Sequence, residues 1–168
     1  MTGTTGPVAL LLGGNLGRRA LYLELACKLL AGAGSLEIAA SSSVFETEPV
    51  ETEGVQPWYL NQVLLVETRY SPEMLLNFCV GVEAFLGRRR TGYHGPRTLD
   101  IDILFYDGIV RKTPRLVLPH PALVRRKSIL APLADVAPRW RHPLAGKTVR
   151  EMLGECADAA SVTRCGEV

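Results

Sequence analysis

Two aspartates, Asp100 and Asp102, stand one residue apart in a stretch that is otherwise apolar. Apolar residues alternate with them from Leu99 to Phe105, and a period of two is typical of a β-strand. Both carboxylates would therefore project from one face, with Cα atoms about 6.5–7 Å apart. Carboxylates this close repel each other, and two divalent cations would offset that repulsion, with oxygen ligands favouring Mg²⁺ or Mn²⁺. The pattern predicts a magnesium site; an exposed polar strand face is the alternative.

Arginines precede the aspartates. Arg97 lies three residues before Asp100, and residues 88–90 are three consecutive arginines. Guanidinium groups form paired hydrogen bonds with phosphate oxygens. Carboxylates that hold magnesium beside such groups indicate a nucleoside triphosphate as ligand. Considered alone, the arginine run is more typical of a solvated loop.

A second polar position lies in the apolar stretch at residues 58–68. In a strand, Asn61 would share a face with Tyr59. An amide in an apolar strand is costly unless it is hydrogen-bonded. The two side chains suit a flat heterocycle, because the amide can pair with the ring edge while the phenol stacks on the ring. Hydrogen bonding of Asn61 to the backbone is the alternative.

The periodicity of the whole chain predicts the elements that position these residues. Ser71 and Pro72 mark a helix start, as N-cap and first helical residue. The predicted order is βαββαβ, which is the order of a ferredoxin-like α+β fold with an antiparallel sheet flanked by helices, an α/β/α sandwich. We expect strands near residues 8–12, 36–44, 58–68 and 99–106, helices near 72–86, 128–136 and 147–156, and an extended loop at 117–121. A further helix should follow residues 15–17, with Leu21, Leu25 and Leu29 on one face, and should end at Gly32 to Gly34. We also expect a single domain over residues 1–168, with flexible tails at 1–6 and about 157–168.

Composition narrows the possible partners. The 168 residues include 19 basic and 17 acidic side chains, and this balance argues against a nucleic-acid or membrane surface as partner. The cysteines at positions 27, 79, 156 and 165 lack metal-site spacing, and we expect reduced thiols in a cytoplasmic protein. The apolar run at 8–12 is too short for a signal peptide or a membrane span. We expect a monomer.

Several short motifs, taken in order, resemble one family. The ordered set is similar to the 6-hydroxymethyl-7,8-dihydropterin pyrophosphokinases of folate biosynthesis, from about residue 8 to about residue 138. The motifs are GGNLG at 13–17, SSVFETEP at 42–49, QPWYLN at 56–61, LGRRR at 86–90, GPRTLDIDIL at 95–104, LPHP at 118–121 and LAPL at 130–133.

The resemblance implies an activity, two substrates and a set of site residues. ATP would transfer its terminal pyrophosphate to 6-hydroxymethyl-7,8-dihydropterin, leaving AMP, with two Mg²⁺ ions as cofactors. Asp100 and Asp102 would hold the metal ions, and Arg88 and Arg97 would complete the catalytic set. The pterin would contact Thr47, Glu48, Val50, Tyr59 and Asn61. ATP would contact Glu83, Arg88, Arg90, Arg97, Ile103, Arg115, His120 and Arg126.

Three positions depart from the usual pattern of that family. One is the aromatic residue expected before Gly95, where His94 stands with Tyr93 before it. Gly14 replaces a common Ser, and glycine suits the tight turn expected there. Ser128 stands where a ring-stacking aromatic residue is common, so the pterin would lose one stacking partner, worth about 1 kcal/mol.

Another enzyme class and two kinds of non-catalytic module are the alternatives to this function. Another magnesium-dependent phosphoryl or nucleotidyl transferase would use the same aspartates, but a different acceptor would be expected to change Tyr59, Asn61 and Thr47. A non-catalytic ferredoxin-like module that binds RNA would need a basic sheet face with exposed aromatic residues. The two aspartates would instead repel phosphate unless metal were bound. A non-catalytic module that binds a regulatory small molecule would leave Asp100 and Asp102 unexplained.

Overall fold

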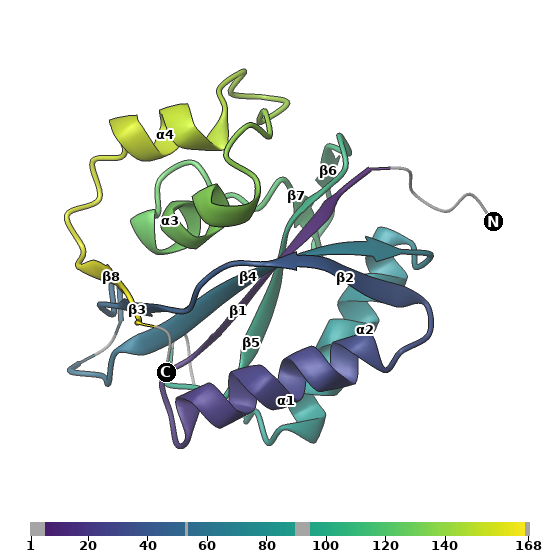
Figure 1. Ribbon diagram of the computed structural model, residues 1–168, viewed down its shortest axis with the longest axis vertical. Coiled ribbons are helices and arrows are strands. Elements are labelled where there is room, and N and C mark those ends of the chain that lie inside the picture. The colour runs from purple at the N-terminus through teal and green to yellow at the C-terminus, as the bar shows by residue number, and fades with distance from the viewer. Residues whose placement is uncertain (1–5, 53, 90–94, 167–168) are drawn as a thin grey trace.

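The computed structural model describes residues 6–52, 54–89 and 95–166. Its strands and helices follow the predicted βαββαβ order, with one additional short strand between the second and third predicted strands and further elements after the fourth (Figure 1). In chain order they are β1 (Val8–Gly14), α1 (Arg19–Ala31), β2 (Leu36–Ser41), β3 (Phe45–Thr47), β4 (Tyr59–Thr68), α2 (Pro72–Phe85), β5 (Asp100–Tyr106), β6 (Arg111–Lys112), β7 (Val117–Leu118), α3 (Lys127–Val136), α4 (Val149–Glu155) and β8 (Val162–Arg164).

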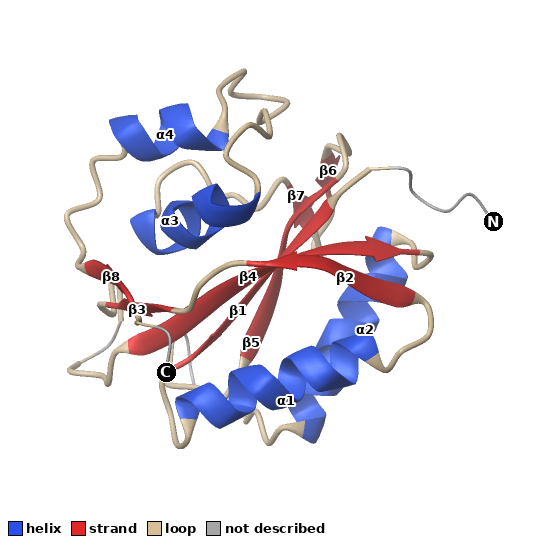
Figure 2. Ribbon diagram, viewed as in Figure 1, coloured by secondary structure: helices blue, strands red, loops and turns tan. Residues whose placement is uncertain are grey.

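The main sheet is antiparallel and has the strand order β5-β1-β4-β3-β8, with β2 also paired to β4. Without β3 and β8, the strand order is β5-β1-β4-β2, which is that of a ferredoxin-like sheet. Helices α1 and α2 cover one face, and α3 and α4 lie on the other (Figure 2). The predicted α+β sandwich is thus confirmed.

The core has two parts because β1 is buried on both faces. Leu10 and Leu12 belong to the apolar cluster under α1 and α2, whereas Ala9 and Leu11 belong to the cluster under α3 and α4. A central strand covered on both sides reads as a continuous apolar run, which is the pattern at residues 8–12.

Helix α2 begins where its sequence predicts. The Ser71 hydroxyl accepts a hydrogen bond from the backbone N–H of Met74 at 3.3 Å, and Pro72 is the first helical residue. This cap satisfies one of the N–H groups that a helix start leaves unpaired. Glu83 lies near the other end of α2 and contacts β5. The residue at which the helix starts therefore determines where Glu83 lies along it.

Strand β5 departs from the predicted alternation. Ala9 pairs with Phe105 while Leu10 pairs with Ile103, so Leu104 is an extra residue in a β-bulge. The bulge turns Phe105 to the face opposite Ile103, where its ring stacks on Trp140 with centroids 3.9 Å apart. Strict alternation, which placed Phe105 beside Ile103, is wrong at this residue.

Two other predictions also change. The predicted strand 36–44 ends at Ser41, and a separate strand, β3, follows at residues 45–47. In the segment predicted as an extended loop, Val117–Leu118 forms β7 and pairs with β6. Neither short strand has an alternating stretch long enough to mark it in the sequence.

The C-terminal segment differs from the flexible tail predicted for about 157–168. Residues 162–164 form β8, which pairs with β3 at the edge of the main sheet. Three residues carry little strand periodicity, and β8 exists because β3 offers an unpaired edge for its hydrogen bonds. The predicted tail at 1–6 lies mostly outside the described residues.

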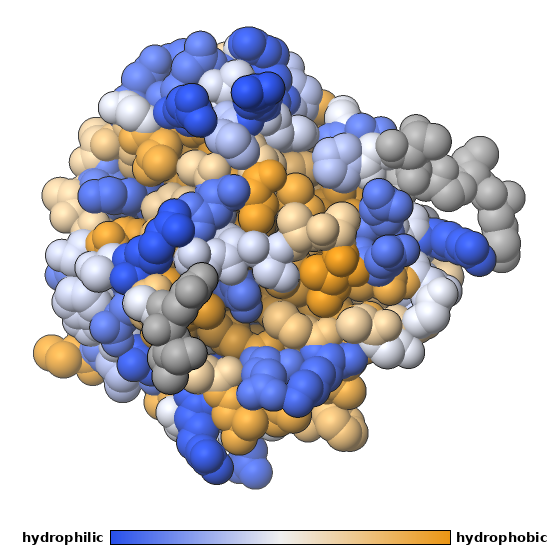
Figure 3. Space-filling model, in the orientation of Figure 1, coloured by the Kyte–Doolittle hydropathy of each residue, from blue (hydrophilic) through white to orange (hydrophobic). Residues whose placement is uncertain are grey.

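The surface is mixed in character. In the view of Figure 3, hydrophilic side chains gather over α4, and apolar side chains are interspersed with hydrophilic ones over the rest of that face. Among the described residues, no helix has the length and apolar character needed to cross a membrane.

His142, buried near α4, gives the fold a pH dependence. Its Nδ1 accepts hydrogen bonds from the backbone N–H groups of Leu144 and Ala145 at 3.2 and 3.1 Å. Burial lowers the pKa of His142 below 6.5. Well above pH 6.5 the ring is neutral in both the folded and the unfolded protein. As the pH falls below 6.5, the unfolded chain binds a proton first, so the free energy of unfolding decreases until the pH falls below the pKa of His142 in the folded protein.

We therefore expect acid to destabilise the wild-type protein more than His142→Asn, whose amide oxygen can accept the same bonds without titrating. Melting temperatures at about pH 7.5 and about pH 5.5 measure this difference. An equal drop in both proteins would contradict the role of His142.

Candidate active site

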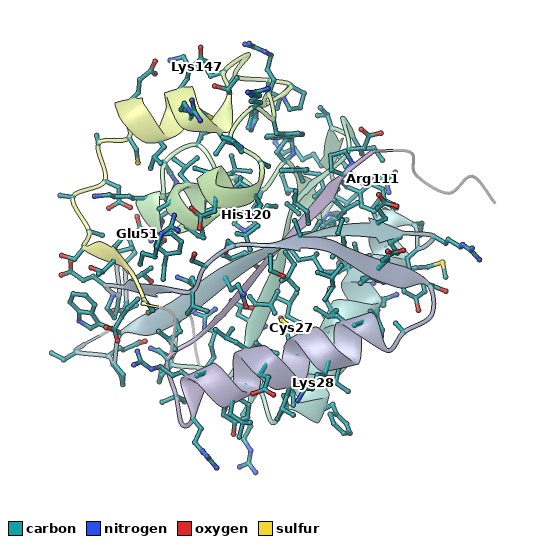
Figure 4. All side chains as sticks on the ribbon, viewed as in Figure 1. Cys27, Lys28, Glu51, Arg111, His120 and Lys147 are labelled. Carbon is teal, nitrogen blue, oxygen red and sulfur yellow. The ribbon has the colours of Figure 1, made fainter. Side chains whose placement is uncertain are left out.

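A cavity of about 380 Å³ lies between the sheet and the start of α3. It is lined by side chains from β3, β4 and β5, by the loop after β3, and by the segment that leads into α3. Predicted site residues that line it are Thr47, Glu48, Val50, Tyr59, Asn61, Arg97, Asp100, Asp102, His120 and Arg126. Figure 4 shows His120 and Glu51 on the side of the sheet that α3 covers.

The strand register explains why this cavity is polar. On the α3 side, apolar residues line up across the sheet at one end, where Ala9 pairs with both Leu65 and Phe105. Four residues further along β1, Gly13 pairs with both Asn61 and Asp100. Helix α3 packs on the apolar end, so the cavity is left over the polar end.

Asp100 is held by two arginines. Its carboxylate accepts hydrogen bonds from Arg88 Nη1 at 2.6 Å and from Arg97 Nη1 at 2.5 Å. These charge-assisted bonds neutralise the carboxylate and fix its orientation. The guanidinium of Arg97 also lies 5.8 Å from the centre of the Tyr59 ring, which joins the two halves of the cavity.

Asp102 is different, because its carboxylate accepts no hydrogen bond from the described residues. Burial raises the pKa of Asp102 to about 8, and the charges of Asp100 and Glu83 add to the effect. A cation at this carboxylate would therefore offset an uncompensated cost of ionisation.

The residues present fit magnesium held together with a substrate. Asp100 and Asp102 supply hard carboxylate oxygens on one face of β5 and line one cavity. The described part of the chain has no cluster of three or more His, Cys, Asp or Glu side chains able to hold a metal ion. Mg²⁺ bound by one or two carboxylates completes its coordination with water and phosphate oxygens.

Glu83 lies behind the aspartates and meets the open edge of β5. One carboxylate oxygen accepts from the backbone N–H of Ile101 at 2.7 Å, and the other accepts from Arg88 Nη1 at 2.5 Å. Burial raises the pKa of Glu83. Glu83 therefore satisfies an edge-strand donor and holds the arginine that in turn holds Asp100.

His120 meets the same edge of β5. Its backbone N–H donates to the carbonyl of Leu104 at 2.7 Å, and its Nδ1 accepts from the N–H of Ala122 at 3.2 Å. Burial lowers the pKa of His120, so the ring is neutral at pH 7. With Nδ1 used as an acceptor, the ring proton is on Nε2, where it is available as a donor.

Thr47 and Asn61 form the opposite wall. The Asn61 amide nitrogen donates to the Thr47 hydroxyl at 2.7 Å, and both side chains are buried. The amide therefore bonds to a side chain rather than to the backbone. Gly13 makes room for it, because a Cβ at that position would lie 2.3 Å from Asn61 Oδ1.

Asn15 and Glu51 were missed as site residues by sequence reasoning. Asn15 is buried, donates to the Gln56 side chain and the Pro57 carbonyl at 3.1 Å each, and accepts from the N–H of Arg97 at 2.9 Å. It ties the loop before β4 to the segment before β5. Its place in a glycine-rich turn was the only signal in the sequence.

The Glu51 carboxylate bridges two arginines of the segment before α3. It accepts from Arg125 Nη1 at 3.1 Å and from Arg126 Nη2 at 2.6 Å. Its backbone has a φ of 53°, a left-handed conformation that non-glycine residues adopt at a cost. Nothing in the sequence around Glu51 marks this conformation or these partners.

Four of the predicted residues that the structure describes do not line the main cavity. Arg88 and Glu83 lie behind Asp100, as described above. Ile103 and Arg115 line an adjoining cavity of about 230 Å³, which shares Asp102 and His120 with the first. Arg90 lies outside the described residues.

Comparison with known proteins gives one consistent result. The family model described as 7,8-dihydro-6-hydroxymethylpterin-pyrophosphokinase (HPPK) matches residues 9–138. A 2-amino-4-hydroxy-6-hydroxymethyldihydropteridine pyrophosphokinase of Methylorubrum extorquens is 39% identical over 145 residues, which are 86% of this chain and 89% of the relative. A protein of the same name from Bacillus subtilis is 38% identical over 125 residues, 74% of each chain.

Solved structures agree on the fold. An HPPK-DHPS structure in complex with substrates superposes with a TM-score of 0.71 at 14% identity, covering 92% of this chain and 43% of that one. An HPPK-DHPS structure from Plasmodium falciparum gives 0.72 at 17% identity, covering 92% and 46%. The present chain thus spans less than half of these longer chains, and the likeness concerns the fold.

The room that Gly13 provides can be tested with Gly13→Ala. The new methyl group would displace the Asn61 amide and break its hydrogen bond to Thr47, at a cost of about 1–3 kcal/mol in the free energy of unfolding. Chemical denaturation measures this cost. A matched Gly108→Ala change, where no atom lies within 4 Å of the added Cβ, should have a smaller effect. Equal effects would refute the steric argument.

Glu83 should stabilise the fold through both of its carboxylate oxygens. Glu83→Ala leaves the Ile101 N–H and the Arg88 guanidinium short of a partner, so we expect a loss of about 2–4 kcal/mol in the free energy of unfolding. Glu83→Gln keeps an acceptor for Ile101 and should lose less. If denaturation curves of the two variants coincide, the bond to Ile101 contributes nothing.

Proposed function

The chain belongs to the 7,8-dihydro-6-hydroxymethylpterin-pyrophosphokinase family, and from this premise we propose how its cavity performs the reaction. The protein is an ATP-dependent pyrophosphokinase of folate biosynthesis. It transfers the terminal pyrophosphoryl group of ATP to the hydroxymethyl oxygen of 6-hydroxymethyl-7,8-dihydropterin and releases AMP. The observation that supports our assignment of the site is that Asp100, Asp102 and the Asn61–Thr47 pair line one cavity.

The pterin is assigned to the wall formed by β3 and β4. The Asn61 amide and the Thr47 hydroxyl present hydrogen-bonding groups to the edge of a flat heterocycle, and Tyr59 offers a ring to its face. Glu48 and Val50 border the same wall. Ser128, at the start of α3, lines the same cavity without an aromatic ring, which leaves Tyr59 to supply the stacking.

The phosphates of ATP are assigned to the basic side of the cavity. Arg97, Arg126 and the Nε2–H of His120 supply donors there. Arg88, which lies behind Asp100, and Arg90 are assigned with them from the family resemblance. Arg126 already binds a carboxylate, that of Glu51, so an incoming phosphate would exchange one anion for another. The nucleoside is assigned to the adjoining cavity beside Ile103 and Arg115.

Asp100 and Asp102 are assigned as the residues that hold two Mg²⁺ ions. Bound magnesium neutralises the charge that develops on the triphosphate. Arg88 and Arg97 keep the Asp100 carboxylate in place, and Glu83 keeps Arg88 in place, so the protein contributes orientation and charge rather than a nucleophile.

We also infer a cytoplasmic monomer. The four cysteines are unpaired, as expected in a reducing compartment. Light scattering at micromolar concentration measures the mass in solution, and a dimer mass would overturn the inference of a monomer.

Product analysis tests the proposed reaction. With ATP, Mg²⁺ and 6-hydroxymethyl-7,8-dihydropterin, we expect AMP to form only when the pterin is present, in amounts equal to the pterin diphosphate. The formation of ADP would indicate simple phosphoryl transfer to the same acceptor. Free pyrophosphate with AMP would indicate hydrolysis, and either outcome would contradict the proposal.

Asp102→Asn should lower turnover by on the order of 10³-fold, because the amide cannot replace a carboxylate as a metal ligand. The melting temperature should not fall, because burial makes ionisation of Asp102 costly and its carboxyl group accepts no hydrogen bond from the described residues. Asp107→Asn is the matched control: Asp107 follows β5 outside the cavity, and Asn tolerates its φ of 50°. Substantial residual activity in Asp102→Asn would contradict the metal assignment.

A further inference from the structure

The C-terminal strap, defined here as residues 157–166, connects two parts of the molecule that form opposite walls of the cavity. It leaves α4, passes the start of α3 and ends beside β3 (the yellow segment of Figure 1). It lies beyond residue 138, where the family match ends. The proposed reaction assigns no role to it.

On one side the strap holds β3. Thr47 pairs with Val162, the N–H of Glu48 donates to the Ser161 carbonyl at 2.9 Å, and the N–H of Ser161 donates to the Glu48 carboxylate at 3.0 Å. Strand β3 has only three residues, and without β8 it would be an edge strand. The strap therefore restrains the backbone and side chains of Thr47 and Glu48, which line the cavity.

On the other side the strap holds the start of α3. The Asp158 carboxylate accepts a hydrogen bond at 2.9 Å from the N–H of Lys127, the first residue of that helix. The N-cap residue Arg126 supplies no side-chain cap of its own, so a residue 31 positions away does so. Arg126 and Ser128, on either side of Lys127, both line the cavity.

We propose that the C-terminal strap is a positioning element of the active site. It sets the pterin wall through β3 and the phosphate wall through the start of α3, and its residues touch neither substrate. The inference rests on the proposed function, because it takes from that function which substrate each wall binds. Loss of one attachment should weaken the binding of one substrate, whereas a purely structural strap would change stability alone.

Thr163→Pro tests the attachment to β3. Ser161 and Cys165 both form backbone hydrogen bonds with the β3 side of the sheet, and in an antiparallel pair every second residue does so. The N–H of Thr163, which lies midway between them and pairs with Glu46, therefore also points toward β3. Proline at this position has no N–H to donate. We expect the KM for the pterin to rise about five- to tenfold, with kcat and the KM for ATP little changed. Thr163→Ala keeps the N–H and changes only an exposed side chain, so it should behave as wild type.

Asp158→Ala tests the attachment to α3 and remains decisive if Thr163→Pro does not fold. We expect the KM for ATP to rise about three- to fivefold, because Arg126 loses its fixed position, with the KM for the pterin less affected. Glu155→Gln is the control, since it removes an exposed carboxylate that pairs with Lys147 just before the strap. Unchanged KM values in both test variants, or parallel increases for both substrates, would overturn the proposal.

Amide hydrogen exchange separates failure of this proposal from failure of the proposed function. In Thr163→Pro, amides of residues 44–50 should exchange faster than in Thr163→Ala, whether or not the wild-type protein converts the pterin. Equal exchange in the two variants would overturn the attachment to β3. Absence of pterin-dependent AMP in the wild type would instead overturn the proposed function.

Discussion

Three carboxylates lie close together, that of Glu83 on α2 and those of Asp100 and Asp102 on β5. Their mutual repulsion has to be compensated. Arg88 bridges Glu83 and Asp100, and Arg97 adds a second cation to Asp100. Breaking a buried charge network costs far more than the network contributes by itself, so these groups are held as a unit. Asp102 is the member without an ion pair among the described residues. The network thus leaves one carboxylate in need of a cation.

The open edge of β5 explains why the surrounding residues are where they are. An edge strand presents N–H and C=O groups with no ladder partner, and those groups must be satisfied when they are buried. The Glu83 side chain takes the N–H of Ile101, and the His120 backbone takes the C=O of Leu104. The hydrogen bonds that satisfy this edge therefore bring the Glu83 carboxylate of α2 and the loop residue His120 to the strand that carries both aspartates. The same hydrogen bonds thus stabilise the edge of the sheet and assemble the site.

The other constraint is that the cavity has two walls from distant parts of the chain. Strands β3 and β4 form one wall, and the segment leading into α3 forms the other. Glu51 joins them through Arg125 and Arg126, and the C-terminal strap joins them through β8 and Asp158. A binding site between such walls is as rigid as the contacts that span it. The exposed ion pairs of Glu51 are easily exchanged, whereas the backbone pairing of β8 is not.

The sequence by itself determined the fold class, the aspartate pair on one strand face, the shared face of Tyr59 and Asn61, and the helix start at Ser71. Each of these follows from local periodicity or capping, which depends only on neighbours along the chain. Tertiary structure decided the rest. The bulge turns Phe105 to the opposite face because Leu104 is an extra residue of β5 with no partner in β1. The arginines bind Asp100 because α2 places Glu83 behind Arg88, and β8 forms because β3 leaves an edge unpaired. These features depend on partners far away in sequence, and no local pattern encodes the distance between two segments that meet only after folding.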